Sequence, residues 1–137
     1  MKFSFDHVEL VDAHPNTVKL NLTGVNGSVL EVVAASIGGG RIRVCEIDGL
    51  PANFEGDYPT LIVRNIDQPG HVMEVTAMLG HKGVNIATLQ LFRKSRGGQA
   101  AMVIECDQEV PAESIKWLSR QEGIVKVTYL SQAQRED

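Results

Sequence analysis

The cysteines and histidines are the side chains of this sequence best suited to bind a metal ion or to act as nucleophiles. Cys45 and Cys106 lie far apart, each inside a strand-like run. A disulfide framework or a metal knuckle needs closer or more numerous cysteines, so we expect two buried free thiols and a reducing cytoplasm. The histidines show neither HxxxH nor HxH ligand spacing: His7, His14, His71 and His81. No Gly-x-Ser-x-Gly elbow occurs. We therefore expect no catalytic residue and no metal site in this chain by itself.

Three consecutive glycines, Gly38-Gly39-Gly40, have the composition of a phosphate-binding loop. A strand-like run follows them, so no helix N-terminus is available to hold an anion. We favour a tight backbone approach or a bulge over ligand binding. The basic run at residues 93–96 continues into Gly97-Gly98 and is interpreted as a solvated hairpin tip. Because the net charge is −4 and basic residues alternate with acidic ones, no nucleic-acid partner is expected.

A polar segment at residues 65–70, Asn-Ile-Asp-Gln-Pro-Gly, joins a strand-like run to a helix-like run. Proline suits the first position of a helix, and Asp67 or Gln68 can cap it. The first backbone N–H groups of a helix are unpaired and suit a carboxylate, and Gly70 has no Cβ that would block access to the backbone. The resemblance described below gives Asp67 a second interpretation, in which its carboxylate pairs with the ammonium group of a ligand.

The elements around this segment follow the order β-α-β-β-α-β, the ferredoxin-like split unit. Periodicity predicts strands at residues 60–66, 84–92, 99–106 and 124–129, and helices at about 67–83 and 112–120. Upstream, alternating runs at 17–22 and 41–47 and a return strand at 29–35 predict an antiparallel meander, and 51–58 is interpreted as a linker. The predicted fold class is α+β, with an antiparallel β region at 1–57, a ferredoxin-like domain at 58–131 and a polar tail at 132–137.

A sheet of this topology has helices on one face, which leaves its other face and its edge strands open. Such surfaces favour aggregation unless something covers them. We expect homodimerisation or docking on another domain to cover them. No apolar run approaches the roughly 20 residues needed to span a bilayer, so no membrane partner is expected.

Two segments resemble the ACT domain, including the serine-sensing domain of phosphoglycerate dehydrogenase: residues 65–72 and Gly83-Val84-Asn85-Ile86-Ala87. The resemblance covers residues 58–130. It implies that an amino acid binds across a dimer interface. The positions that it marks as ligand-binding are Asn65, Asp67, Gly70, Asn85 and Ile86. Asn65 and Asp67 stand where the dehydrogenase domain has His and Asn. Asn85 is alternatively a structural turn residue.

The upstream motifs extend the resemblance to residues 8–130. His14-Pro15-Asn16-Thr17 and Ser36-Ile37 with the glycine triplet resemble the β subunit of bacterial iron–sulfur L-serine dehydratase. This implies a partner α subunit whose [4Fe-4S] cluster converts L-serine to pyruvate and ammonia. The cluster is not expected in this chain, since two distant cysteines cannot supply three thiolates. The Ser-Ser-Ser-His-Thr segment usual in such β subunits is absent, which indicates a truncated or reduced relative.

The sequence therefore predicts a cytoplasmic regulatory or assembly part of an L-serine ammonia-lyase. Its ACT domain binds L-serine or another small amino acid and forms a homodimer. One alternative is an ACT unit without a ligand that serves only to join subunits. Another is an ACT domain that regulates some other amino-acid enzyme.

Overall fold

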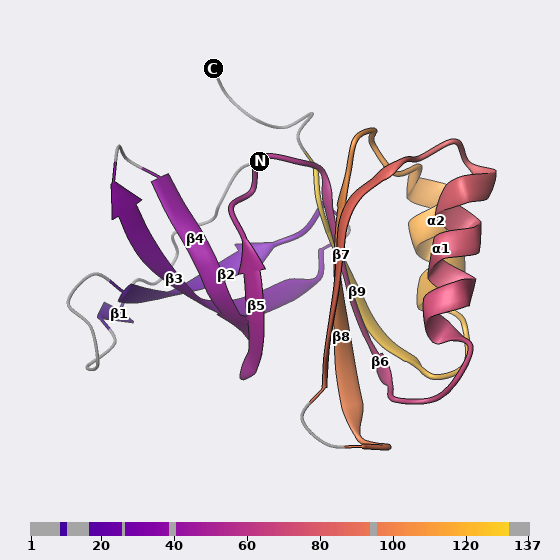
Figure 1. Cartoon of the computed structure of the whole chain (residues 1–137), viewed down its shortest axis with the longest axis horizontal. Helices are drawn as coiled ribbons and strands as arrows, with labels where there is room; N and C mark the ends of the chain where they lie inside the picture. Colours follow the sequence, from indigo (N-terminus) through magenta and orange to yellow (C-terminus); the bar gives the residue numbers. More distant parts are fainter. Residues whose placement is uncertain (1–8, 11–16, 26, 39–40, 94–95, 132–137) are drawn as a thin grey trace.

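The chain folds into two antiparallel sheets, one of which carries two helices (Figure 1). This computed structural model describes residues 9–10, 17–25, 27–38, 41–93 and 96–131. The α+β class and the ferredoxin-like unit expected from the sequence are confirmed. The motif at residues 14–17 lies almost wholly outside the described residues, as do Gly39, Gly40 and the predicted tail at 132–137.

The first sheet is a meander in the order β1-β2-β3-β4-β5. Its strands are β1 (Glu9–Leu10), β2 (Thr17–Thr23), β3 (Val29–Gly38), β4 (Arg41–Ile47) and β5 (Leu50–Phe54). Asp48 and Gly49 join β4 to β5 with φ of 44° and 84°, the positive values that a tight two-residue hairpin needs. β5 occupies residues 51–54 of the predicted linker at 51–58, so that half of the prediction is wrong, while residues 55–58 do connect the two sheets. The residues of β5 form a strand because buried and exposed side chains alternate along it, with Leu50, Ala52 and Phe54 buried.

The second sheet has the order β7-β8-β6-β9. Its strands are β6 (Thr60–Ile66), β7 (Ile86–Arg93), β8 (Gln99–Cys106) and β9 (Ile124–Leu130). Both helices, α1 (His71–His81) and α2 (Ala112–Ser119), lie on the same side of this sheet (Figure 1). Gly83 follows α1 with φ of 72° and ends it as expected. Ile115 and Leu118 of α2 are buried in the cluster between the helices and this sheet.

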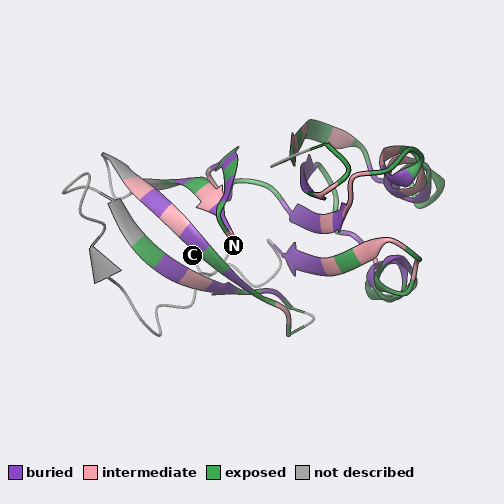
Figure 2. Cartoon of the chain, turned by 90° about the horizontal axis from the view of Figure 1, so that it is seen from below, coloured by how far each residue is buried: buried purple, intermediate pink, exposed green. Residues whose placement is uncertain are grey.

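Each face of the second sheet has its own hydrophobic cluster. On one face, α1 and α2 pack against buried strand residues, among them Leu61, Val63 and Ile104. The opposite side contributes Ile62 and Val103 to a cluster formed mostly by the first sheet. The first sheet thus covers the face that the sequence left open (Figure 2). Docking on another part of the same chain, one of the two remedies expected, buries that face.

A cluster of charges joins the two sheets at the β4–β5 turn. The Asp48 carboxylate accepts hydrogen bonds from Arg64 Nη1 at 3.1 Å and Lys126 Nζ at 3.3 Å, both from the second sheet. Its other oxygen accepts the Glu31 backbone N–H at 3.0 Å. These side chains are largely shielded from solvent, which strengthens their attraction relative to an exposed pair.

A second set of contacts joins the β2–β3 turn to β9. The Val25 N–H donates to the Tyr129 carbonyl at 3.0 Å, and the Ser28 and Thr128 hydroxyls lie 2.6 Å apart. The two sheets therefore share backbone and side-chain hydrogen bonds as well as apolar surface. The division of the chain into regions 1–57 and 58–131 stays a prediction.

The two thiols differ from expectation in one respect. Cys106 is buried, whereas Cys45 is exposed and donates to the Val33 carbonyl at 3.2 Å. The prediction of a buried Cys45 is wrong because its neighbour Val44 takes the inward position of the alternating strand. None of the helices among the described residues is long and apolar enough to cross a membrane.

Candidate functional site

The β6–α1 turn, residues 67–70, forms one side of the candidate site. Helix α1 begins at His71 with Gly70 as its N-cap, at φ of 99°, and no side chain caps it. The interpretation of Asp67 as the helix N-cap is therefore wrong. Only glycine takes this left-handed backbone at little cost, and the chain then enters the helix at His71, two residues after Pro69. Gly70 is open, since a Cβ placed there would meet nothing within 4 Å.

Asp67 is used instead to fasten the turn to the β7–β8 hairpin. Its Oδ2 accepts hydrogen bonds from Arg93 Nη1 at 3.1 Å and from the Gly97 N–H at 3.0 Å. Its own N–H donates to the Gly98 carbonyl at 2.7 Å. The Gly97 N–H and the Arg93 guanidinium lower the pKa of the Asp67 carboxyl. The carboxylate is therefore ionised and already holds a cation and an amide, which limits what it can offer a ligand.

Two buried polar atoms without partners lie near the start of α1. The Asn65 amide nitrogen donates to the Ile66 carbonyl at 2.9 Å, but its Oδ1 has no hydrogen-bond partner among the described residues. His71 Nδ1 lies 3.4 Å from a Glu74 carboxylate oxygen, while the buried Nε2 is likewise unpaired in the part of the chain described here. Because buried polar atoms almost always have a hydrogen-bond partner, these two atoms indicate that a partner is missing.

The loop before β9 determines where the His71 ring lies. A Cβ on Gly123 would come within 2.5 Å of His71 Cε1 and Nε2, so this glycine leaves room for the ring. The Gly123 carbonyl also accepts the Ile66 N–H at 2.8 Å. The sequence motif at residues 65–72 contains His71, but no role in ligand binding was predicted for it. Its position directly after Pro-Gly was the only available signal.

Asn85 and Ile86 lie elsewhere. Asn85 Nδ2 donates to Asp107 Oδ2 at 2.7 Å, and its N–H donates to Gln108 Oε1 at 2.7 Å. Ile86 is half-buried and pairs with Cys106 at the far end of β8. Asn85 thus has a structural role in the loop before β7. Its side chain remains exposed, so this role does not exclude contact with a ligand.

Within one chain, the fold brings together Asn65, Asp67 and Gly70 with the unassigned His71. It keeps Asn85 and Ile86 at the other end of the sheet. The first group has hydrogen-bond acceptors, an imidazole and open helix N–H groups, which suit a small zwitterion. Among the described residues, no group of three His, Cys, Asp or Glu side chains is placed to hold a metal ion.

The comparisons with known proteins point to serine enzymes. No protein-family model matches the chain. It is 32% identical over 123 residues to a "Probable L-serine dehydratase, beta chain" of Bacillus subtilis, covering 90% of this chain and 56% of that protein. Identity to the L-serine dehydratase beta chain of Peptoniphilus asaccharolyticus is 30% over 103 residues, covering 75% and 46%. A D-3-phosphoglycerate dehydrogenase of Methanocaldococcus jannaschii is 33% identical over 88 residues, 64% of this chain and 17% of that one.

These comparisons confirm the resemblance to the L-serine dehydratase β subunit. The chain spans about half the length of the dehydratase β chains that it matches. Its second sheet and helices are an ACT-type unit, which agrees with the similarity to D-3-phosphoglycerate dehydrogenases.

Proposed function

We propose that this chain is the regulatory part of an L-serine ammonia-lyase and that its ACT unit binds L-serine. The observation that carries the proposal is a pair of buried atoms that have no hydrogen-bond partner among the described residues, Asn65 Oδ1 near the end of β6 and His71 Nε2 at the start of α1. An amino acid offers both groups that these atoms need. Its ammonium donates to Asn65 Oδ1, and its carboxylate accepts from the His71 imidazole and the first N–H groups of α1.

A second copy of the chain would complete this site. β7 is the edge strand of the described second sheet, and its Leu89 and Leu91 are 39% and 48% exposed. Antiparallel pairing of two β7 strands would bring the Asn85 end of one copy beside the Arg93 end of the other. The hydroxyl of L-serine would then lie within reach of the Asn85 amide. Dimerisation in this mode also covers the exposed leucines.

The wider assembly is inferred from the relatives. Two of them are named as beta chains of L-serine dehydratase, which supports an α-subunit partner. That partner would hold the [4Fe-4S] cluster and eliminate the serine hydroxyl to give pyruvate and ammonia in the cytoplasm. Serine bound here changes activity only if two enzyme states bind it differently, with a typical coupling of about 1–3 kcal/mol.

Isothermal titration of the purified chain with L-serine tests the ligand, with D-serine and glycine as controls. We expect saturable heat for L-serine and weak or no heat for D-serine. His71→Phe keeps a ring against Gly123 but removes the donor, so it should weaken binding at unchanged thermal stability. Asn85→Ala should weaken it as well. Equal affinity in both variants would disprove the site.

The second candidate function is an assembly module without a ligand, which the exposed leucines on edge strand β7 favour. It predicts a dimer and no heat with any amino acid at millimolar concentration. Leu91→Lys separates the candidates. In the sensor it should abolish both the dimer and serine binding, whereas in the assembly module only the dimer is lost.

A further inference from the structure

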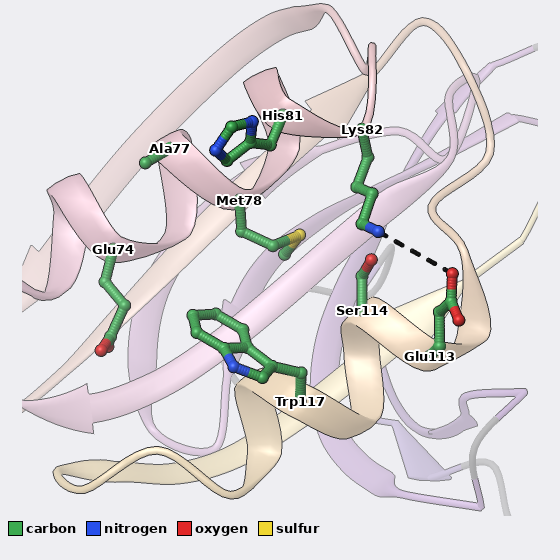
Figure 3. A pocket seen from close by; sticks show the side chains of 8 residues that line it. All are labelled: Glu74, Ala77, Met78, His81, Lys82, Glu113, Ser114 and Trp117. Carbon is green, nitrogen blue, oxygen red and sulfur yellow. Dashed lines mark ion pairs between the residues drawn. The ribbon is translucent and has the colours of Figure 1, made fainter.

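A groove of about 710 Å³ runs between α1 and α2 on the face away from both sheets. Its walls are mainly apolar, formed by Ala77 and Met78 from α1 and by Trp117 from α2. Figure 3 shows the Met78 side chain from α1 and the Trp117 side chain from α2 on facing sides of it. Trp117 is 45% exposed and is the single tryptophan of the chain. An exposed indole beside an apolar groove is costly in water and typical of a protein contact.

The charges along α1 are distributed unevenly around the centre of this groove. Glu74 lies at one end, whereas His81 and Lys82 lie at the other, where Lys82 Nζ is 3.8 Å from a Glu113 oxygen (Figure 3). Eight residues of helix separate Glu74 from Lys82, which is about 12 Å at 1.5 Å per residue. That separation is too long for the ammonium and carboxylate of one amino acid. It matches the same two residues on a helix that runs in the opposite direction.

The α1 residues that line the groove have the spacing of a helix–helix contact. Glu74, Ala77, Met78 and His81 stand at i, i+3, i+4 and i+7, a single stripe along the helix. A two-fold axis beside Ala77 and Met78 would place Glu74 of each copy against His81 and Lys82 of the other. The exposed Ala77 at the middle of this stripe is small enough to let two backbones come close.

We propose that this groove is a second self-association surface, in which α1 of another copy lies antiparallel between α1 and α2. The apolar stripe of each copy covers the Met78 and Trp117 side chains of the other. Lys82 then lies between Glu113 of its own chain and Glu74 of the second copy. The surface is separate from edge strand β7, so a chain using both surfaces associates beyond a dimer.

The test uses charge reversal in the Leu91→Lys background, where pairing through β7 is blocked and only the helical surface remains. Sedimentation velocity and Trp117 emission are followed as the chain is concentrated. We expect a monomer–dimer equilibrium, with emission moving to shorter wavelength as the dimer forms. Glu74→Lys should weaken association at least tenfold. Adding Lys82→Glu to Glu74→Lys should restore part of it, because the attraction between the two copies is recovered with the signs exchanged while Glu113 repels the new carboxylate of its own chain.

The matched control is Glu31→Lys, an exposed charge reversal on the first sheet, which should leave association unchanged. Failure of the double variant to recover while its melting curve matches the parent would overturn the proposal, as would a parent that stays monomeric. A short-wavelength emission in a strictly monomeric chain would show that the Trp117 indole is already shielded without a second copy, which would also overturn the proposal. None of these outcomes depends on whether serine binds at the β6–α1 turn.

Discussion

Asn65 and Asn85 lie at opposite ends of the second sheet. Asn65 pairs with Ala100 at the start of β8, whereas Ile86, next to Asn85, pairs with Cys106 at its end. Six residues of strand separate the two ends, about 20 Å at 3.3 Å per residue. One small amino acid cannot contact both side chains of the same chain. If both bind the ligand, they must come from different copies.

Mixing two defective variants should therefore restore part of the binding. Asn65→Ala and Asn85→Ala each spoil every site of their own homodimers. A heterodimer of the two has one intact site and one doubly altered site. We expect L-serine heat to appear after the variants are mixed and allowed to exchange, as measured by titration. Continued absence of heat in a verified heterodimer would mean that the two residues do not share a site.

Gly123→Ala should destabilise the fold more than an equivalent change elsewhere. Alanine at φ of 85° is strained, and its Cβ would also overlap the His71 ring. We expect a loss of about 2–4 kcal/mol in the free energy of unfolding, from the backbone strain and the overlap together. The control is Gly83→Ala, which has φ of 72° and open space around its Cβ and should lose only about 1–2 kcal/mol.

The His71→Ala background identifies the source of that difference. Without the imidazole, the further cost of Gly123→Ala should fall to the Gly83→Ala level. Urea unfolding of the four variants measures this. Additive costs would show that the ring does not press on Gly123.

Asp48→Asn should loosen the contact between the two sheets. Asparagine tolerates the positive φ of 44° and can still accept the Glu31 N–H, so the change removes mainly the charge. Arg64 and Lys126 then lose their shared carboxylate. We expect the free energy of unfolding to fall by about 1.5–3 kcal/mol, the usual range for hydrogen bonds to charged groups.

The matched control is the exposed pair of Lys19 and Glu31, 3.4 Å apart. Lys19→Gln should cost about 0–1 kcal/mol, as exposed ion pairs do. Added salt should reduce the stability difference between the parent and Asp48→Asn only slightly, because the Asp48 charge cluster is largely shielded from solvent. Thermal unfolding of the three chains at low and high salt provides the comparison. Equal costs would show that Asp48 does not hold the sheets together.

The two thiols should react differently. Cys45 is exposed, so a thiol reagent at pH 8 should modify it in the folded chain and reach Cys106 only after unfolding. Burial, with the nearby Asp107, Glu105 and Glu109, raises the Cys106 pKa from 9.0 to about 11. Two modified thiols in the folded chain would contradict the burial of Cys106.

The raised Cys106 pKa also gives stability a pH dependence. The unfolded chain loses this proton near pH 9 and the folded chain near 11, so stability is kept below pH 9 and falls as the pH rises from 9 to 11. Tyr129, whose pKa is raised by burial and by Glu109, acts in the same direction above pH 10. Urea unfolding between pH 9 and 10 should therefore show a decline that Cys106→Ala lacks.

Local patterns determined most of the secondary structure. Alternation predicted β2, β3 and β4, and residues 99–106 predicted β8 with its observed bounds. Asp48-Gly49 and Gly83 marked turns because their backbones take positive φ, which is a property of the residue and its neighbours. The wrong predictions involved the same kind of local reasoning applied to positions that tertiary contacts control. Asp67 is a residue type that often caps a helix, but its carboxylate accepts hydrogen bonds from Arg93 and Gly97 instead.

The sequence by itself determined the α+β class, the order of the ferredoxin-like unit and the motif that links this chain to serine enzymes. Only the tertiary structure decided that the first sheet covers the second, that His71 has a buried nitrogen with no partner in the described part of the chain, and that Asn65 and Asn85 lie far apart. The reason is physical. Turn chemistry and hydrophobic periodicity act over a few neighbouring residues, whereas burial and hydrogen-bond pairing depend on segments that meet only after the chain has folded.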